Sequence, residues 1–430
     1  MKKYETYKDS GIQWWEEIPT HWDLKKAKHM FSLITENVSD SSLPKIALEN
    51  IESWTGKYIE TDSDFMGDGV EFKKDDILFG KLRPYLAKVY KAQFAGQAVG
   101  DIYVFRGNKE QIPEYLKYLL LSYPFISVVD GSTYGAKMPR ANWDFISHLV
   151  LPCPPKTEQV TIAAYLDHKV GQIDATISEK EKMLEDLKAY RSAIISKAVT
   201  KGLDKNVEMK DSGIEWIGMI PKHWNTNKLK FFADISTGTT PSTANDEYWK
   251  EAAENWYTPS DFKEGDIHLK ESLRRVSSVA FEKSACRIFK KNVVLVVGIG
   301  ATLGKIGISS VECSANQQIN AIEFYDNVYP LFGAYYLSSL KEVMNSLAST
   351  ATLAIMNQSI TGSIPFVCPT LDEQKEIADY LEKKTESIGS LLNQIKTQVE
   401  ELKSYKSTLI TEAVTGKIDL RGWKPKVENI

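Results

Sequence analysis

Two long stretches of the chain carry apolar residues at the spacing of an amphipathic helix. In the stretch that begins at Thr157 and the one that begins at Asp372, successive apolar positions lie three, four or seven residues apart. This spacing predicts helices that pack along another helix. Each stretch spans about 40 residues, or about 60 Å at 1.5 Å per residue. The apolar positions are Ile162, Leu166, Val170, Ile173, Ile177, Leu184, Leu187, Ile194 and Ala198 in the first stretch, and Ile377, Leu381, Ile388, Leu392, Ile395, Val399, Leu402, Leu409 and Ala413 in the second.

A helix this long with a single apolar stripe needs a partner, and the other long helix is the obvious one. We expect the two to form an antiparallel intramolecular pair. Thr157 and Asp372 are the expected N-caps, because each follows a proline-containing segment and precedes an acidic residue in the first turn. The polar faces, such as residues 179–182, are either solvated or a docking surface for another protein.

The regions outside these helices mix strand-like and helix-like runs, in the same order twice. The pattern predicts an α+β fold, with two globular domains separated by two long antiparallel, coiled-coil-like helices. The runs are 76–79, 102–105 and Pro113 to about Leu121 in the first region, and 293–297, 321–324 and Pro330 to Leu347 in the second.

The repeated order reflects an internal duplication. Residues 9–22, DSGIQWWEEIPTHW, and residues 211–224, DSGIEWIGMIPKHW, are identical at nine of fourteen positions, at an offset of 202. Residues 158–166 and 373–381 are identical at six of nine positions, at an offset of 215. We therefore expect one unit repeated with pseudo-two-fold symmetry, with about 13 extra residues in the second copy.

The flanking segments of the two copies are more alike than the regions between them. This contrast indicates that the copies keep one architecture and do different versions of one task. Simple drift after duplication is the alternative, but drift should have eroded the flanks as well. The expected segments are a first domain at 1–155, a central long helix and linker at 156–207, a second domain at 208–369, and a C-terminal long helix and tail at 370–430.

Composition narrows the class of protein without identifying a partner. The 430 residues carry 53 Lys and Arg against 57 Asp and Glu, a formal net charge of −4, which excludes a basic-tail nucleic-acid binder but not a basic patch. No apolar run reaches the roughly 20 residues that span a bilayer, so we expect no membrane partner. The four cysteines form no CxxC pair, which excludes zinc-finger spacings and favours a reducing cytoplasm with unpaired thiols.

The most suggestive single motif fails on its spacing. Residues 298–305, GIGATLGK, follow a predicted strand and look like a phosphate loop, but Ile299 stands where the first glycine belongs. A strand–turn–strand with Lys305 exposed beyond the turn fits better. In the first copy the equivalent segment, FGKLRPYLAK from Phe79, forms a short basic and aromatic cluster. A solvated hairpin tip is the alternative interpretation.

Late in each domain comes a segment of small polar residues. Residues 131–143, GSTYGAKMPRANW, and residues 349–359, STATLAIMNQS, combine hydroxyl, amide and basic side chains, and residues 316–318, NQQ, add amides. Such side chains suit contacts with phosphates and base edges, and Asn or Gln can pair bidentately with adenine. An ordinary polar loop is the alternative.

Enzymatic constellations are missing from the sequence. The six His show no metal-ligand spacing such as HExxH, and no GxSxG nucleophile elbow occurs. His21 and His223 stand in the repeated Pro-x-His-Trp and are expected to be structural. A duplicated enzyme should show its catalytic set twice. We therefore expect a non-catalytic chain with no catalytic, cofactor-binding or metal-ligating residues.

Taken together, these segments resemble the specificity subunit of type I restriction–modification systems over nearly the whole chain. The resemblance rests on a set of motifs in a fixed order, each modest alone. They are the doubled DSGIxW…IPxHW entry, FGKLRPYL from Phe79, STGTTPS from Ser236, WYTPSDF from Trp256, VGIGATLGKIG from Val297, ANQQINAI from Ala315 and the doubled EQxxIAxYL.

The resemblance implies a division of labour. Each globular domain is a target-recognition domain that reads one half of a bipartite, non-palindromic DNA sequence, and the long helices set the spacer. Two modification subunits dock on the helices and use S-adenosylmethionine to methylate adenine, while restriction subunits use ATP and Mg to translocate and cleave. This chain would bind double-stranded DNA and supply recognition only, in the cytoplasm of a bacterium or archaeon.

Two other classes stay open at this point, a stand-alone repressor-like bipartite DNA binder and a coiled-coil scaffold whose domains bind protein. We expect phosphate contacts from lysines such as Lys81, Lys88 and Lys305, and base contacts from residues such as Arg83, Arg140, Gln317 and Gln358. The candidate DNA-binding residues are Lys81, Arg83, Tyr85, Lys88, Ser132, Thr133, Tyr134, Lys137, Arg140 and Asn142 in the first domain, and Thr239, Ser242, Ser260, Lys305, Gln317, Gln318, Thr350, Thr352, Asn357 and Gln358 in the second.

Overall fold

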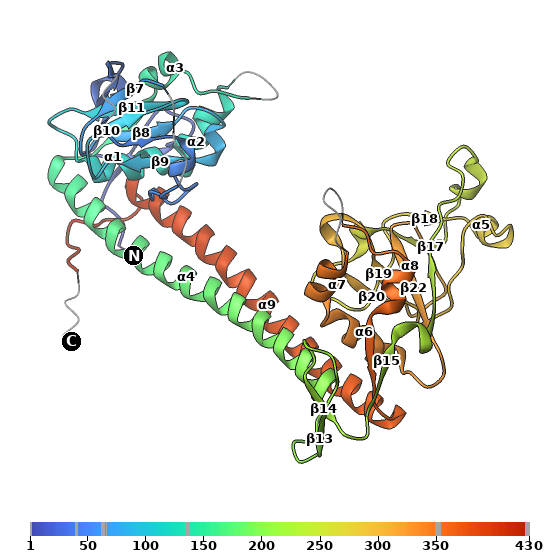
Figure 1. Ribbon diagram of the computed structural model, residues 1–430. Coiled ribbons are helices and arrows are strands. Elements are labelled where there is room, and N and C mark those ends of the chain that lie inside the picture. Colours follow the sequence, from blue (N-terminus) through green and yellow to red (C-terminus); the bar gives the residue numbers. More distant parts are fainter. Residues whose placement is uncertain are drawn as a thin grey trace. The chain divides into compact units, whose positions relative to one another are not determined.

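The computed structural model describes residues 2–38, 42–61, 65, 67–133, 138–348 and 354–425. The chain forms two compact units (Figure 1). Unit 1 comprises Met1–Glu181 and Thr397–Ile430, and unit 2 comprises Lys182–Lys396. Each long helix contributes residues to both units.

The two long helices are confirmed as α4, Lys156–Lys201, and α9, Leu371–Val414. The predicted N-caps are wrong, because Thr157 and Asp372 already lie inside the first turns. At α9 the hydroxyl of Thr370 donates to Glu373 Oε2 (2.7 Å) and accepts from the Glu373 amide (3.4 Å), so the cap lies outside the predicted start.

Within each unit α4 and α9 run antiparallel, as expected. In unit 1, Asp174 pairs with Lys406 (2.9 Å), whereas Lys180, further along α4, bonds to the earlier Gln398 (2.8 Å). In unit 2 the buried residues 198–199 of α4 share one apolar cluster with residues 377–381 of α9. The apolar stripes therefore face each other in both units, since most of their positions are buried.

Unit 1 is built on an antiparallel sheet with strand order β4-β11-β8-β9. A smaller sheet with order β5-β7-β10-β6 and two strand pairs, β1–β2 and β3–β12, complete it. The aromatic core includes Phe31, Phe79, Phe105 and Phe125, all buried. The elements are β1 (Tyr7–Asp9), β2 (Glu17–Pro19), β3 (Asp23–Lys26), η1 (Ala27–His29), β4 (Phe31–Ile34), β5 (Asn37–Val38), β6 (Lys45–Ile46), η2 (Leu48–Asn50), β7 (Gly69–Phe72), β8 (Ile77–Gly80), η3 (Pro84–Leu86), β9 (Val89–Lys91), β10 (Gly96–Ala98), β11 (Ile102–Gly107), α1 (Pro113–Leu121), α2 (Tyr123–Gly131), α3 (Trp143–His148) and β12 (Val150–Cys153).

Unit 2 repeats this plan with the strand order β16-β22-β19-β20. The predicted helix-like run from Pro330 to Leu347 is two helices, because the backbone leaves helical geometry at Leu340. The elements are β13 (Met209–Asp211), β14 (Met219–Pro221), β15 (Asn225–Lys228), η4 (Leu229–Phe231), β16 (Ala233–Thr237), η5 (Asp246–Tyr248), β17 (Glu254–Tyr257), η6 (Pro259–Asp261), β18 (Arg275–Val276), α5 (Ser278–Glu282), β19 (Val294–Val297), η7 (Gly300–Thr302), β20 (Ile306–Ile308), β21 (Ser314–Ala315), β22 (Ile319–Phe324), α6 (Pro330–Ser338), α7 (Lys341–Leu347), α8 (Gln358–Ser363) and β23 (Pro365–Cys368).

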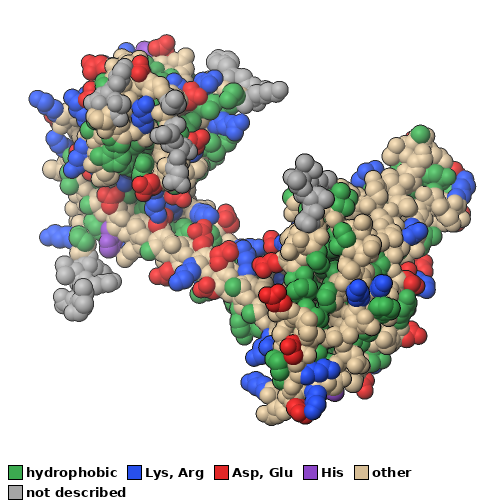
Figure 2. Space-filling view, viewed as in Figure 1, with side chains coloured by type: hydrophobic (Ala, Val, Ile, Leu, Met, Phe, Trp, Pro, Cys, Tyr) green, Lys and Arg blue, Asp and Glu red, His purple; other side chains and the backbone are tan. Residues whose placement is uncertain are grey.

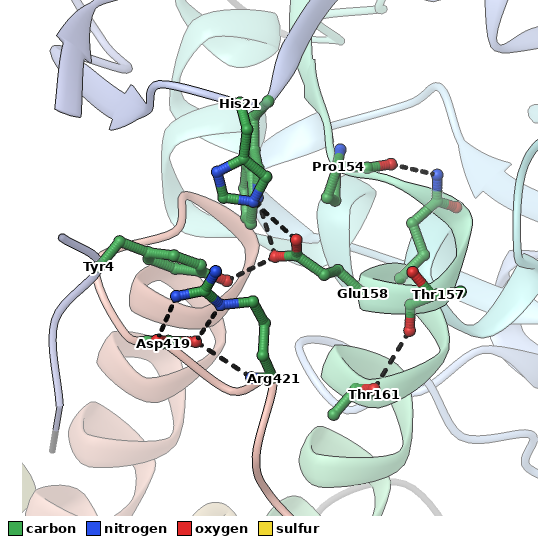
Figure 3. A network of polar contacts seen from close by, with 10 residues as sticks. Tyr4, His21, Pro154, Thr157, Glu158, Thr161, Asp419 and Arg421 are labelled. Carbon is green, nitrogen blue, oxygen red and sulfur yellow. Dashed lines mark hydrogen bonds and ion pairs between the residues drawn. The ribbon is translucent and has the colours of Figure 1, made fainter. Parts of the chain in front are cut away.

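The duplicated motifs hold each domain to the start of its long helix. In unit 1 the carboxylate of Glu158 accepts from Trp22 Nε1 (3.1 Å) and the Tyr4 hydroxyl (2.8 Å), and lies 2.6 Å from His21 Nε2 (Figure 3). In unit 2 Glu373 accepts from the Trp224 indole (3.2 Å) and pairs with His223. The His residues of the Pro-x-His-Trp motif are therefore structural, as predicted.

The neighbouring glutamines form a second matched contact. Gln159 Oε1 accepts from the Ile112 amide just before α1 (2.9 Å), and Gln374 Oε1 accepts from the Tyr329 amide just before α6 (2.7 Å). The Glu-Gln pair that recurs in the sequence thus joins the Pro-x-His-Trp motif and the residue before α1 or α6 to the long helix of each unit.

Among the described residues, no helix is long and apolar enough to cross a membrane. The four cysteines are unpaired, as expected. Three of them are buried, and burial raises the pKa of the Cys313 thiol to about 12.

Candidate nucleic-acid interface

In unit 1 the two segments singled out in the sequence lie side by side. The amide of Arg83 donates to the carbonyl of Pro139 (2.8 Å), and the amide of Ala141 donates to the carbonyl of Lys81 (2.8 Å). A third bond runs from the Lys81 amide to the carbonyl of Asp101 (2.9 Å). These three bonds bring the turn after β8, the start of β11 and the approach to α3 into one small frame.

The side chains on this frame are charged. Arg140 donates two hydrogen bonds to the carboxylate of Asp101, both 3.1 Å long, and Lys81 Nζ lies 3.7 Å from the same carboxylate. Lys81 also lies 5.3 Å from the ring centroid of Tyr103. The hydrogen bonds from Arg140 hold the pKa of Asp101 below its usual range. Because half of the Arg140 side chain is exposed, its guanidinium is oriented but still open to solvent.

Arg83 and Tyr85 project from the same turn. Arg83 is exposed and adopts a left-handed backbone conformation with φ +50°. No carboxylate in the described part of the chain forms an ion pair with it. Tyr85 is 46% exposed, and its carbonyl accepts from the indole of Trp54 (3.1 Å). The turn thus presents an unpaired guanidinium and a phenol to solvent.

Unit 2 contains the same backbone frame with different side chains. The Gly300 amide donates to Ala354 (3.1 Å), the Met356 amide to Gly298 (2.8 Å), and the Gly298 amide to Gln318 (2.8 Å). These bonds correspond one by one to those of unit 1, so Gly298 occupies the position of Lys81, and Gln318 occupies the position of Asp101. Gly300, at φ +80°, replaces Arg83.

Amides and hydroxyls gather around this second frame. The Thr240 hydroxyl lies 2.5 Å from Gln317 Oε1, and Gln358 Nε2 donates to the Thr237 hydroxyl (2.9 Å). Gln318 Oε1 accepts from Asn316 (3.1 Å). Gln317 and Gln358 are exposed, and the cluster carries no formal charge.

Several further candidates have local structural roles. Asn142 and Asn357, at equivalent positions, are the N-caps of α3 and α8, accepting from Asp144 and Ile360 respectively. The remaining candidates in the described segments are the following. Ser132 and Thr133 donate to carbonyls at the end of α2, Thr239 accepts from the Arg287 amide, the Ser242 carbonyl accepts from Trp249, and Ser260 is exposed within η6.

Lys88 and Lys305 occupy equivalent positions and are both held inside their own units. Lys88 Nζ donates to the carbonyl of Leu48 (2.6 Å), and Lys305 Nζ donates to the carbonyl of Phe262 (2.9 Å). Desolvation lowers the pKa of Lys88. The predicted strand–turn–strand at β19 and β20 is confirmed. The prediction that Lys305 is exposed is wrong, because its ammonium turns back to cap η6.

Four candidates, Tyr134, Lys137, Thr350 and Thr352, lie outside the described residues. Sequence reasoning missed Asp101, Thr237 and Thr240 as members of the two clusters. Thr237 and Thr240 lie within the STGTTPS motif from Ser236, so that motif was a usable signal. No sequence motif marked Asp101, because it meets Arg140 only through the backbone hydrogen bonds that join their segments.

The chemistry of these clusters suits contact with a polar ligand rather than catalysis. No group of three or more His, Cys, Asp or Glu that could hold a metal ion occurs among the residues that the structure describes. On the face shown in Figure 2, basic and acidic side chains are interspersed over each unit. On this face the two units are alike in their mixture of charges, so they differ mainly in the side chains on their frames.

Comparison with known proteins gives a consistent family. Residues 221–401 match the family described as the type I restriction modification DNA specificity domain. A putative type I restriction enzyme MjaX specificity subunit from Methanocaldococcus jannaschii is 24% identical, covering 97% of this chain and 98% of that protein. The EcoBI specificity subunit from Escherichia coli is 23% identical, covering 68% of this chain and 64% of the relative.

Solved structures share the fold. A chain from a study of the assembly and conformational transition of the type I R-M system matches with a TM-score of 0.74 at 16% identity, covering 93% of this chain and 99% of its own length. The HsdS subunit from Thermoanaerobacter tengcongensis matches with a TM-score of 0.51, also at 16% identity, with 93% and 98% covered. Residues 221–401 thus carry the type I restriction modification DNA specificity domain, and nearly the whole chain is similar to type I restriction enzyme specificity subunits.

Proposed function

We propose that this chain is the DNA-specificity subunit of a type I restriction–modification complex, and that each recognition domain reads one half of a bipartite, non-palindromic target. The observation that carries the proposal is the pair of equivalent backbone frames with unlike side chains. A shared frame places both sets of side chains in the same way within their domains. Different side chains on it then select different bases.

The side chains of each frame indicate the type of contact. Arg83 and Arg140 present guanidinium groups, which pair bidentately with guanine O6 and N7. Asp101 positions Arg140 for such a contact. Gln317 and Gln358 present amides, which pair bidentately with adenine N6 and N7. We infer that the first half-site contains guanine and the second contains adenine at the positions these residues contact.

Catalysis belongs to partner subunits, as this family's specificity subunit is a non-catalytic recognition subunit. We propose two modification subunits that bind S-adenosylmethionine and methylate adenine, and restriction subunits that use ATP and Mg. With a formal net charge of −4, this chain has no excess positive charge for phosphate contacts. The modification subunits would therefore supply most of the salt-sensitive affinity for DNA. A cytoplasmic location is part of the proposal, since the target is DNA and the thiols are unpaired.

The test is reconstitution with the modification subunit and mapping of methylated adenines. The expected result is methylation of one split sequence. Arg140→Ala should relax the choice of base in one half only, and Gln317→Ala with Gln358→Ala should relax it in the other half. Methylation without sequence preference, or loss of both halves with either variant, would contradict the proposal. A stand-alone repressor has no support among the relatives, which are specificity subunits of restriction enzymes.

We also propose that the long helices set the length of the unspecified spacer. Removing four residues from α4 and four from α9 shortens each helix by about 6 Å, or nearly two base-pair steps of 3.4 Å. The reconstituted complex should then methylate a target whose spacer is shorter by one or two base pairs. An unchanged spacer would refute this role.

A further inference from the structure

Unit 2 contains an open apolar pocket beside its helix pair that no described residue fills. Its volume is about 670 Å³, within the range of pockets that hold a ligand or a large side chain. Tyr190 of α4 and Tyr380 of α9 line it, together with Leu203, Val207 and Met209 from the segment after α4.

The exposure of these side chains is unusual. Tyr190 is 56% exposed and Leu203 is 41% exposed, although both border other apolar groups. Contiguous apolar surface rimmed by polar residues marks interaction sites on soluble proteins. The exposed charged residues that line the pocket, here called its rim, are Lys197, Lys201 and Lys205, with Asp204 as the acidic residue among them.

The duplication provides a second copy of this surface for comparison. At the offset of 215, Tyr190 corresponds to Tyr405 and Tyr380 corresponds to Tyr165. In unit 1 an aromatic side chain from the chain's own C-terminal tail covers Tyr165. The indole of Trp423 stands edge-on to the Tyr165 ring, with centroids 5.3 Å apart and an interplanar angle of 85°, and lies 5.8 Å from His168.

The pocket of unit 2 lacks such a cover because the chain takes another route. After α4 the residues from Leu203 to Met209 line the pocket and then enter the β13–β14 hairpin. No Trp, Tyr or Phe occurs between Lys201 and Asp211. The surface therefore keeps the tyrosine pair of unit 1 without the intramolecular indole that covers it.

The charge at one position is reversed between the two surfaces. Lys197 in unit 2 stands where unit 1 has Glu412. In unit 1 the occupant is followed by Lys424 and preceded by Arg421, which pairs with Asp419. The basic rim of the unit 2 pocket accordingly favours an occupant whose aromatic side chain is flanked by carboxylates.

We propose that this pocket binds an aromatic side chain, flanked by Asp or Glu, from a segment of one modification subunit. The proposal rests on the proposed function, because it assumes that the modification subunit is the partner. Edge-to-face contact with Tyr380, like that of Trp423 with Tyr165, and ion pairs with the rim lysines hold the segment. A second copy of this chain is a poorer occupant, since its own Trp423 lies in a basic tail.

The test measures binding of the purified modification subunit to the full chain by isothermal titration. Tyr190→Ala removes one wall, and the double variant Lys201→Glu/Lys205→Glu reverses the rim. Each should weaken the affinity of one modification subunit at least tenfold. Tyr405→Ala is the matched control, since it alters the equivalent, similarly exposed tyrosine of unit 1, and it should change the affinity less than twofold.

A photo-crosslinking amino acid at position 203 identifies the occupant independently of folding effects. The expected crosslink joins the modification subunit at an aromatic residue beside carboxylates. Crosslinks to another copy of this chain, or wild-type affinity in both Tyr190→Ala and the lysine reversal, would overturn the inference. If variants with wild-type affinity still assemble a complex that methylates a split target, the inference fails and the proposed function is unaffected. If the wild-type chain binds no modification subunit, the proposed function itself fails.

Discussion

The carboxylate of Asp174 lies 2.9 Å from the ammonium of Lys406 in unit 1, and the equivalent pair in unit 2 is Gly389 and Arg191. Arg191 therefore lacks the α9 carboxylate that would correspond to Asp174, although Asp266 acts on it electrostatically. Its Nε has no hydrogen-bond partner among the described groups, and desolvation lowers its pKa. The Cβ of a residue at position 389 would meet no atom within 4 Å.

Gly389→Asp should stabilise unit 2 by forming an ion pair with Arg191 that is equivalent to the pair of Asp174 and Lys406 in unit 1. Gly389→Ala is the control, because Ala alone improves helix propensity by about 1 kcal/mol. Asp is a weaker helix former than Ala, so without the pair it would stabilise less. We expect Gly389→Asp to match or exceed Gly389→Ala in the local unfolding free energy from hydrogen exchange of α9. Equal or greater stabilisation in the Arg191→Gln background would contradict the pairing.

Glu158 should contribute more to stability than its counterpart Glu373. Glu158→Ala leaves the Trp22 indole and the Tyr4 hydroxyl without their acceptor in a buried place, at a cost of about 3 kcal/mol to unit 1. Glu373→Ala should cost unit 2 about half as much, since His223 and Glu373 are partly exposed. Hydrogen exchange resolves the two units separately. Equal losses in both units would argue against burial as the cause.

The pH dependence of unit 2 should carry a contribution from Glu373. Burial raises the pKa of this carboxyl, but hydrogen bonds from Thr370, His223 and Trp224 outweigh burial, so its pKa lies below the usual 4.5. A carboxyl with a lowered folded pKa stabilises the folded state above its unfolded pKa, and this stabilisation is lost as the pH falls through the folded pKa.

We therefore expect unit 2 to lose stability as the pH falls below about 4.5. Glu373→Gln should flatten this acid limb of the stability curve, because Gln does not titrate. Thermal unfolding followed across that range checks the prediction. Asp101, whose pKa is also lowered, provides the corresponding group in unit 1, so Asp101→Asn should flatten the acid limb of that unit instead. An unchanged acid limb in Glu373→Gln would show that other groups dominate.

Much of the architecture was predictable because it depends on local pattern. The spacing of residues such as Ile162 and Leu166 predicts α4, and the doubled motifs predict two similar units. The error at Pro330–Leu347 has a local cause as well. The apolar period continues through Ser339 and Leu340, although the backbone turns there, so periodicity alone could not separate α6 from α7.

The candidate site was only partly predictable because its parts meet through long-range contacts. The sequence places Lys81 and Arg140 in separate segments, and the backbone bonds between those segments join them through Asp101. Lys305 shows the opposite case. Its position after a turn predicts exposure, but the carbonyl of Phe262, distant in sequence, takes up its ammonium. The contacts of a side chain on a turn depend on neighbours distant in sequence, which the periodicity of apolar residues does not reveal.

The carboxylate of Asp101 should tune recognition by orienting Arg140. Asp101→Ala releases both Arg140 and Lys81, which lowers discrimination at one base pair by about 1–3 kcal/mol. The same change removes a negative charge near DNA, so affinity for unrelated DNA should rise. Competition binding with the reconstituted complex measures both quantities. If Asp101→Ala changes neither, Arg140 does not read a base through this geometry.

The C-terminal tail should stabilise unit 1 through Trp423. The tail also bonds to the N-terminal segment, since the Asp419 amide donates to the Lys2 carbonyl (2.9 Å) and the Tyr7 hydroxyl to the Gly416 carbonyl (3.2 Å). Arg421 lies over the Tyr4 ring and pairs with Asp419 (Figure 3). Removing the half-buried indole in Trp423→Ala should cost unit 1 about 2 kcal/mol, because its edge-to-face contact with Tyr165 is lost.

Trp14→Ala is the matched control for this prediction, because it removes the same side chain from a position that is 38% exposed in the β1–β2 turn. We expect it to cost less than about 0.5 kcal/mol. Hydrogen exchange of the N-terminal strands distinguishes the two variants, since only the tail variant should release them. Trp423→Ala should also expose Tyr165, creating in unit 1 an uncovered tyrosine pair like that of unit 2. A Trp423→Ala protein as stable as Trp14→Ala would show that the tail adds nothing to unit 1.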